Sequence, residues 1–245
     1  MARSVAITGA GSGIGRATAQ AFLAKGWRVA LMGRRRDRLE ETADGHPAAC
    51  VLPCDVSDAG QLDAAFARID AEFGRLDVLF NNAGIFTPAG LIDEIDAADF
   101  DRAVAVNLTG AFACARRAFA MMRRQAPRGG RIINNGSISA HVPRPGSVCY
   151  TATKHGLTGL TRSLALDGRA YDIACGQIDI GNARTEMVAG LGAAAVAGAD
   201  GAGAEATMDL AEVARSVLHM AEMPLEANIP FMTVMATKMP YMGRG

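Results

Sequence analysis

Short apolar segments alternate with longer stretches of helical periodicity along almost the whole chain, and this alternation limits the possible folds more than any other feature. The apolar segments with the length and composition of β-strands are residues 4–8, 28–33, 49–54, 76–81, 131–135, 173–180 and 230–234. Nearly continuous apolar strands must be covered on both faces, and connecting helices provide that cover in a parallel sheet. We therefore expect an α/β protein with a doubly wound parallel sheet of about seven strands.

The chain is predicted to form one domain, residues 1–245, because open α/β sheets reach this length and no linker interrupts the pattern. One segment departs from this alternation of strand and helix patterns, because residues 188–206 are rich in Ala and Gly. Long irregular segments in compact domains are often functional, so we expect a substrate lid around residues 184–208. The alternative is an insertion without a role.

Charge, cysteine and histidine content exclude several kinds of partner. The 25 basic and 25 acidic residues balance, which gives no support for a nucleic-acid partner. Every apolar run is shorter than the roughly 18 residues that suggest a membrane span, and the N-terminus lacks the apolar core of a signal peptide. The five cysteines form no Cys-x-x-Cys pair and the histidines are scattered. We expect a cytoplasmic protein with free thiols and no metal.

A glycine-rich turn, TGAGSGIG at residues 8–15, follows the first predicted strand and leads into a helical run. Residues without side chains let the backbone approach a pyrophosphate, which then binds to exposed N–H groups at the helix N-terminus. The turn therefore predicts a dinucleotide site. Its predicted contacts are Gly9, Ser12, Gly13, Ile14 and Gly15.

The end of the second predicted strand indicates which dinucleotide binds. An acidic residue there would bind the ribose 2′-hydroxyl of NAD, but this chain has Gly33 followed by three arginines, residues 34–36. Arginine forms charge-assisted, often bidentate contacts with a phosphate. We therefore expect NADP(H) in preference to NAD(H), with Arg34 as the main contact. The alternative is that these arginines are simply solvated at a helix start.

Tyr150 and Lys154 lie four positions apart in the helix-compatible run CYTATKHG, so their side chains are neighbours on one helical face. A free phenol titrates near ~10, too high for a base at neutral pH. We expect the Lys154 ammonium, together with a positively charged nicotinamide, to lower the pKa of Tyr150 by stabilising the phenolate.

Six motifs in order resemble those of the short-chain dehydrogenase/reductase family over nearly the whole chain. They are TGAGSGIG at 8–15, CDV at 54–56, NNAG at 81–84, Asn107 in AVNLTG, GSIS at 136–139 and YTATK at 150–154. The resemblance implies a Rossmann-like fold in which Tyr150 is the general acid and base, Ser137 its partner at the substrate oxygen, Lys154 the pKa modifier and Asn107 the support of a proton relay. Ser139 is a competing candidate for the serine.

The same resemblance implies further contacts with the cofactor. They are Asp55 and Val56 at the adenine, Asn82, Ala83 and Gly84 beside the ribose, and Gly181 and Thr185 near the nicotinamide. One motif departs from the family pattern, because Ile180 stands where a proline is usual. This puts the local course of the chain in doubt, since proline fixes φ and has no N–H.

These observations predict an oxidoreductase that transfers a hydride between NADP(H) and a carbonyl or secondary alcohol of modest size. The alternatives are an NAD(H)-dependent dehydrogenase, a non-catalytic nucleotide sensor on the same scaffold, and an epimerase or dehydratase using the same site. His141 and Arg144 lie between Ser137 and Tyr150, either at the substrate mouth or, as we favour, in a plain loop. The resemblance also implies a homotetramer, or a homodimer.

Overall fold

The computed structural model describes residues 2–185 and 206–241. This part of the chain forms one seven-stranded sheet in the order β3-β2-β1-β4-β5-β6-β7, in which every neighbouring pair is parallel. The predicted strands are confirmed within two residues at each end. Their bounds are β1 Ser4–Thr8, β2 Arg28–Gly33, β3 Ala49–Pro53, β4 Val78–Asn81, β5 Gly130–Asn135, β6 Ile173–Gly181 and β7 Phe231–Met235.

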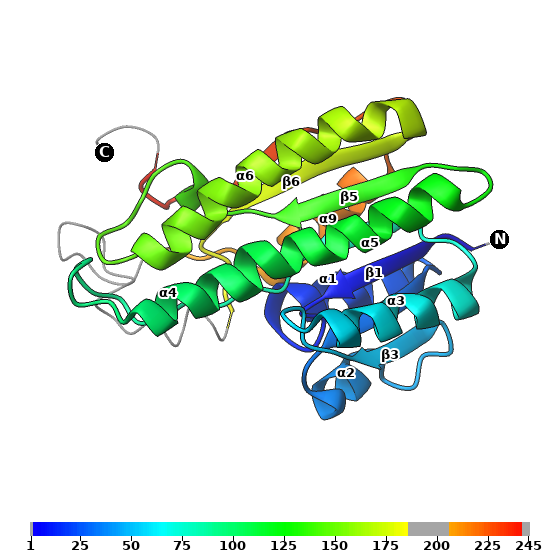
Figure 1. Ribbon diagram of the computed structural model, residues 1–245, viewed down its shortest axis with the longest axis horizontal. Coiled ribbons are helices and arrows are strands. Elements are labelled where there is room, and N and C mark those ends of the chain that lie inside the picture. Colours follow the sequence, from blue (N-terminus) through cyan, green and yellow to red (C-terminus); the bar gives the residue numbers. More distant parts are fainter. Residues whose placement is uncertain (1, 186–205, 242–245) are drawn as a thin grey trace.

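Helices cover both faces of this sheet, as Figure 1 shows. The apolar side chains of α1, α2 and α9 join one buried cluster, and those of α3, α5 and α6 pack in the cluster on the other face. The prediction of a doubly wound sheet is therefore confirmed. The helices are α1 Gly13–Ala24, α2 Arg36–Ala43, α3 Ala59–Phe73, α4 Ala97–Val104, α5 Ala111–Arg124, α6 Val148–Gly168 and α9 Leu210–Glu222.

The strand order reverses between β1 and β4, because the chain first adds strands on one side of β1 and then on the other. The loops that leave the carboxyl ends of these two strands diverge, and this opens a crevice. Ligands of open α/β sheets bind in such a crevice. The fold thus places the glycine turn after β1 and the NNAG segment after β4 at the same edge.

A π-helical turn, η1 (Ala105–Gly110), joins α4 to α5 and carries Asn107. An inserted π turn changes the direction of side chains and is frequent at functional sites. Here it directs the Asn107 side chain toward the segment that follows β4.

The structure shows the course of the chain at Ile180, the residue that stands where a proline is usual. The strand continues through Ile180 to Gly181, which pair with Val234 and Met235 of β7. Isoleucine keeps the backbone N–H that a ladder requires, whereas proline would remove it. The chain then turns at Asn182, which has a φ of 47°.

Most of the predicted lid, residues 184–208, lies outside the described residues. No helix within residues 2–185 and 206–241 has the length and hydropathy needed to cross a membrane. The same residues contain no cluster of His, Cys, Asp and Glu that could hold a metal ion. All five cysteines are free and buried.

Candidate active site

A cavity lies beyond the carboxyl ends of β1, β4, β5 and β6, where the topology predicts a ligand site. A second cavity adjoins it on the side of β2 and β3. The two cavities share Gly9, Ser12, Ala83 and Gly84 in their walls. Together they form one elongated crevice with the glycine turn at its centre.

The glycine turn fits closely between β1 and β4. A Cβ on Gly15 would lie 2.1 Å from the Gly9 carbonyl oxygen, so no side chain is possible there. Gly9 itself has a φ of 67°, in the left-handed region that favours glycine. Ser12, Gly13 and Ile14 line the first cavity. The turn therefore exposes backbone to the crevice at the start of α1, as a phosphate site requires.

Thr8 fixes the segment after β4 to the end of β1. Its hydroxyl accepts hydrogen bonds of 2.9 Å from the backbone N–H groups of both Asn82 and Ala83. The Asn82 amide donates to the Thr8 carbonyl at 2.9 Å and accepts from Asn135 of β5 at 2.9 Å. Asn82 is thus a structural link between three strand ends as well as a wall of the crevice.

Basic side chains gather at the outer end of the crevice. Arg34, which is exposed, lines the second cavity with Arg35 and Arg38. Arg38 belongs to α2 and was not among the sequence candidates, because its helical position only faces the cavity once α2 has packed. Asp55 and Val56 line the same cavity, and the Asp55 carboxylate accepts hydrogen bonds from the Ser57 backbone N–H and hydroxyl.

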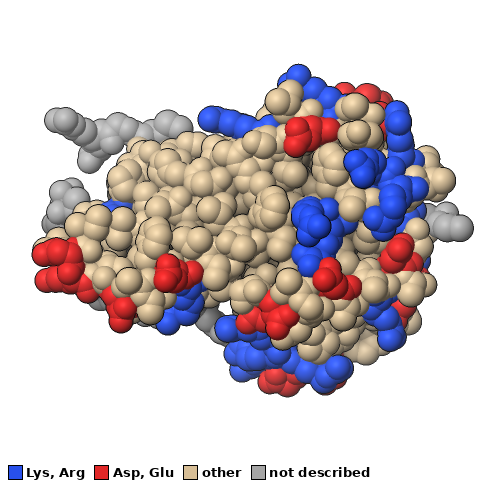
Figure 2. All heavy atoms as spheres, viewed as in Figure 1, with Lys and Arg blue, Asp and Glu red and all other residues tan. Residues whose placement is uncertain are grey.

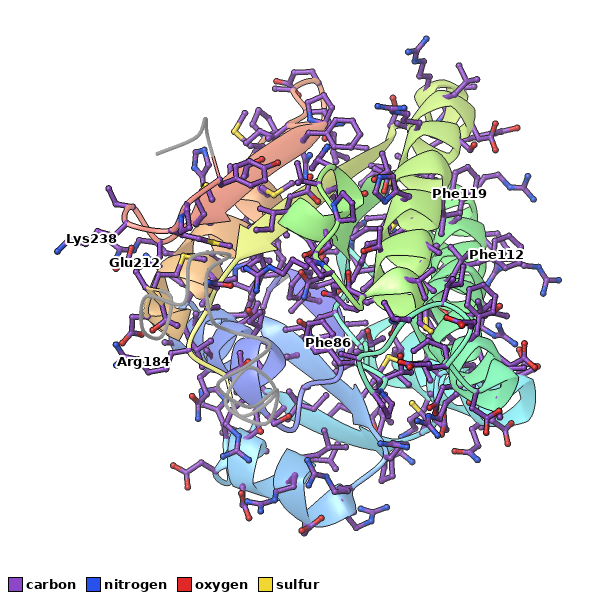
Figure 3. The ribbon with its side chains drawn as sticks, turned by 90° about the vertical axis from the view of Figure 1, so that its left-hand side faces the viewer. Phe86, Phe112, Phe119, Arg184, Glu212 and Lys238 are labelled. Carbon is purple, nitrogen blue, oxygen red and sulfur yellow. The ribbon has the colours of Figure 1, made fainter. Side chains whose placement is uncertain are left out.

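Ser137, Tyr150 and Lys154 line the inner cavity together. The ammonium of Lys154 lies 5.3 Å from the centre of the Tyr150 ring, which confirms that the two share one face of α6. The Tyr150 ring also packs against Phe86, with 4.1 Å between ring centres. Figure 3 shows Phe86 near the middle of the molecule, whereas Phe112 lies on the outer side of the helices.

The pKa values of this group differ from the sequence prediction. Burial raises the pKa of Tyr150 to about 12, and although hydrogen bonding with Ser137 and the charge of Arg144 lower it, the charge of Asp179 adds to the rise. Burial also lowers the pKa of Lys154 to about 8, against the opposing effect of Asp179. The side chains of the protein thus raise the pKa of Tyr150, because desolvation outweighs the Ser137 hydrogen bond and the Arg144 charge. The lowering expected from Lys154 together with a positively charged nicotinamide stays a prediction.

Asn107 holds the wall of the cavity. Its amide accepts from the Ile85 backbone N–H at 2.8 Å and donates to the Ile85 carbonyl at 3.0 Å, with a further contact of 3.3 Å to Thr153. The two hydrogen bonds to Ile85 hold the backbone in place one residue before Phe86. The structure thus brings Asn107 to the site, and its role in a proton relay stays a prediction.

The segment after β6 contributes only part of what the sequence predicts. Thr185 lines the inner cavity, and so do Ile180 and Asn182. Gly181 is buried and faces Met235 and Met239, since a Cβ there would lie 2.9 and 3.1 Å from their side chains. Gly181 therefore supports the wall of the site from behind, because β6 continues where a loop was expected.

Between Ser137 and Tyr150, two side chains make contacts with residues of β6 and the turn after it. They are Arg144 and His141. Arg144 lines the inner cavity and donates a 3.0 Å hydrogen bond to Asn182. His141 bonds to Asp179 at 2.8 Å. The plain loop role that we favour stays a prediction, and the position of Arg144 in the cavity wall supports the alternative. Ser139 also lines the cavity, and its backbone N–H donates to the Ser137 hydroxyl at 3.1 Å.

Comparison with known proteins finds similarity to short-chain dehydrogenases. The family model described as short chain dehydrogenase matches residues 3–196. The 2-(R)-hydroxypropyl-CoM dehydrogenase of Xanthobacter autotrophicus is 38% identical over 194 residues, which cover 76% of this chain and 77% of that protein. Two solved structures share the fold at 24% identity. The 3-ketoacyl-(acyl-carrier-protein) reductase from Brucella melitensis complexed with NADH has a TM-score of 0.85, covering 95% of this chain and 96% of that one. Serine dehydrogenase complexed with NADP+ has a TM-score of 0.87, covering 99% and 98%.

Proposed function

Because the chain belongs to the short-chain dehydrogenase family, we propose that it transfers a hydride between NADP(H) and a carbonyl compound or secondary alcohol. The observation that carries the proposal is the meeting of Ser137, Tyr150 and Lys154 in one cavity that continues into the crevice of the glycine turn. A phenol, a hydroxyl and a buried ammonium in such a site are equipped for proton transfer at an oxygen atom.

The residues of the crevice fit a dinucleotide. Because Gly15 has no side chain, the turn can pack against Gly9 and keep its backbone open to a pyrophosphate at the start of α1. Ala83 and Gly84 line the same cavity. Arg34, with Arg35 and Arg38 nearby, supplies the positive charge that a 2′-phosphate requires. Thr185 lines the inner cavity, where the nicotinamide end would lie.

In this proposal the reduced nicotinamide supplies the hydride that a carbonyl carbon accepts. Tyr150 donates its phenolic proton to the carbonyl oxygen, so that the product is an alcohol and the tyrosine is left as a phenolate. Ser137 donates a hydrogen bond to the same oxygen and stabilises the charge that develops there. Lys154, held close to the ring, stabilises the phenolate. The reverse sequence oxidises the alcohol.

The walls of the inner cavity favour a partly apolar substrate of modest size. Phe86, Ile138 and Ile180 supply apolar surface near Tyr150, and Arg144 borders the mouth. A pocket of this kind is suited to a ketone or aldehyde with a short apolar group; a 3-oxoacyl thioester is one option.

We also propose a homotetramer or homodimer in the cytoplasm. Figure 2 shows a broad face over α5 and α6 that has few charged side chains. Phe112 and Leu166 are 52% and 61% exposed on these helices, and apolar surface of this kind marks interfaces. The free thiols suit a reducing compartment. Analytical ultracentrifugation tests the assembly, and a monomer at micromolar concentration would contradict it.

The proposed activity is tested by incubating the purified protein with NADPH and a panel of small ketones, aldehydes and 3-oxoacyl thioesters. We expect NADPH oxidation with at least one class, and one alcohol formed for each NADPH consumed, measured by mass spectrometry. Binding of NADPH without oxidation across the panel would support the sensor alternative instead. An isomer or dehydrated product without NADPH consumption would identify an epimerase or dehydratase.

A further inference from the structure

Asp179, in the last part of β6, is a carboxylate without any exposed surface. One of its oxygens accepts hydrogen bonds from the Ser137 backbone N–H at 3.0 Å and from the Gln177 amide at 2.7 Å. The other oxygen lies 2.8 Å from Nε2 of His141, whose side chain is 41% exposed. The carboxylate therefore connects β6 to both ends of the short turn that follows β5.

The contacts continue from Asp179 into α6. The Gln177 amide also donates to the Thr158 hydroxyl at 3.0 Å, and its carbonyl oxygen accepts from the Thr161 hydroxyl at 3.0 Å. Every member of this chain of contacts is buried. Because Gln177 is held on two sides, it fixes the position of the Asp179 oxygen that meets Ser137.

Asp179 lies directly behind the wall of the inner cavity. Its neighbours Gly136, Ser137 and Ile180 line that cavity. A Cβ on Gly136 would lie 2.0 Å from the Asp179 carboxylate, so the strand end and the carboxylate are in direct contact. Burial of a carboxylate is costly unless its contacts compensate, and this one is placed at the residue that bears the proposed catalytic hydroxyl.

We propose that Asp179 is a positioning residue of the active site, which holds the backbone of Ser137 and places a fixed negative charge behind the Tyr150–Lys154 pair. The inference rests on the proposed function, because it assigns Asp179 a part in the same proton transfer. Asp179 does not touch the substrate. It acts through Ser137 and through its charge.

Four titratable or charged side chains surround this carboxylate or the phenol that it influences. They are Tyr150 and Lys154 on α6, His141 at the end of the turn, and Arg144 in the following loop. The Asp179 charge acts to raise the pKa values of both Tyr150 and Lys154, while Arg144 acts in the opposite direction on Tyr150. A negative charge here keeps the proton on the phenol and on the ammonium.

The Asp179 charge favours the form of the site in which Tyr150 is protonated. With its proton retained, Tyr150 is ready to donate to a carbonyl oxygen, which is the reductive direction. Alcohol oxidation requires the phenolate first, so the Asp179 charge is expected to move the rise of the oxidation rate to higher pH. Removing the charge should therefore move that rise to lower pH.

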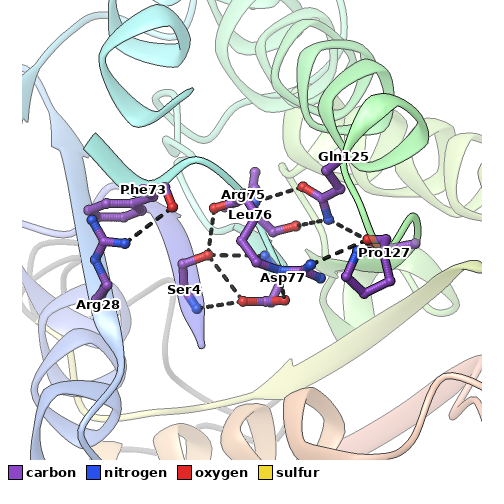
Figure 4. A network of polar contacts seen from close by, with 9 residues as sticks. Ser4, Arg28, Phe73, Arg75, Leu76, Asp77, Gln125 and Pro127 are labelled. Atoms are coloured by element: carbon purple, nitrogen blue, oxygen red, sulfur yellow. Dashed lines mark hydrogen bonds and ion pairs between the residues drawn. The ribbon is translucent and has the colours of Figure 1, made fainter. Parts of the chain in front are cut away.

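The test compares Asp179→Asn with the wild type and with Asp77→Asn. The amide is nearly isosteric and keeps an oxygen for the Ser137 N–H, but it has no charge. Asp77 is the matched control, because at the opposite end of the sheet it accepts from the Ser4 backbone N–H at 2.8 Å and pairs with Arg75 at 2.7 Å (Figure 4). If Asp179→Asn does not fold, the same measurements are made on Asp179→Ser, which also lacks the charge.

For Asp179→Asn we expect NADPH binding within about twofold of wild type, kcat for carbonyl reduction lower by about tenfold, and the pH midpoint of alcohol oxidation moved to lower pH. Asp77→Asn should move neither kcat nor the midpoint. A loss of rate with an unchanged pH profile would show a purely structural role and overturn the proposal, as would an unchanged kcat and profile.

A second readout separates this inference from the proposed function. The absorbance of ionised tyrosine, with Tyr150→Phe as the subtraction, follows the Tyr150 phenol without any substrate. We expect it to titrate at lower pH in Asp179→Asn than in the wild-type background, even if no carbonyl compound in the panel is reduced. An identical Tyr150 titration in both proteins would refute the role of the Asp179 charge.

Discussion

The ammonium of Lys154 donates a hydrogen bond of 2.6 Å to the backbone carbonyl of Asn135, the last residue of β5. This bond ties α6 to the sheet beside the cavity and holds the charge near the Tyr150 ring. Only 4% of Lys154 is exposed, and burial lowers its pKa to about 8 from the ordinary 10.5. Keeping Lys154 protonated in the folded state therefore lowers the free energy of unfolding.

This penalty predicts a pH-dependent difference in stability between wild type and Lys154→Met. Below pH 8 the lysine is protonated in both folded and unfolded states and the penalty is complete. As pH rises from 8 to 10.5, the folded state binds fewer protons than the unfolded state, so stability increases. We expect the wild-type free energy of unfolding to gain about 3 kcal/mol relative to the variant over this range. Urea unfolding at several pH values measures it, and a difference that stays constant would contradict the prediction.

Arg34→Ala should remove the preference for NADPH. Arg34 lines the outer cavity, so its loss should weaken NADPH binding by about tenfold, which corresponds to about 1.4 kcal/mol, and leave NADH binding nearly unchanged. Arg36→Ala is the matched control, because Arg36 pairs with Glu40 on the exposed side of α2. Fluorescence titration with both nucleotides measures the four affinities. Equal loss with Arg36→Ala, or tighter binding of NADH by the wild type, would show that the arginines only contribute surface charge.

Gly136→Ala should unfold the protein or destabilise it by at least about 3 kcal/mol. The added methyl group would lie 2.0 Å from the Asp179 carboxylate and 2.7 Å from the Gln177 amide, both buried. Gly60→Ala is the control, since its Cβ would meet only Asp58, at 3.4 Å. Thermal unfolding compares the two. A Gly136→Ala protein as stable as Gly60→Ala would mean that β5 and β6 are not packed as described.

The cysteine thiols should resist modification in the folded protein. All five are buried, and burial raises the pKa of Cys114 and Cys175 to about 12, which suppresses the reactive thiolate. We expect less than one thiol per chain to react with a maleimide reagent under native conditions and all five to react after unfolding in urea. Rapid labelling of one cysteine in the native protein would contradict the packing of its strand or helix.

Much of the fold could be predicted from local sequence. Each strand is nearly continuous in apolar residues because both faces of the sheet are covered, so the pattern alone located the strands and the parallel arrangement. The glycine turn was predictable for a similar reason, because Gly9 and Gly15 have conformational and steric requirements that few residues satisfy. Tyr150 and Lys154 share a face by simple helical geometry.

The rest of the site depends on contacts between distant segments. Nothing in the segment of β6 indicates that Asp179 meets Ser137 and His141, which lie 42 and 38 positions earlier. The link from Thr8 to Asn82 spans 74 positions. The rise in the pKa of Tyr150 could not be predicted from the sequence either, because the balance between desolvation and charge depends on burial, which only the packed structure determines.

The proton transfer assigned to Tyr150 is tested most directly by Tyr150→Phe, with Tyr171→Phe as the control. The phenylalanine ring retains the packing against Phe86, so NADPH affinity should stay within about twofold of wild type. Tyr171 lies just past the end of α6, where it packs against Phe119. We expect kcat for carbonyl reduction to fall about a thousandfold in Tyr150→Phe and to be unchanged in Tyr171→Phe. Retention of more than about a tenth of the wild-type rate by Tyr150→Phe would contradict the assignment of Tyr150 as the general acid.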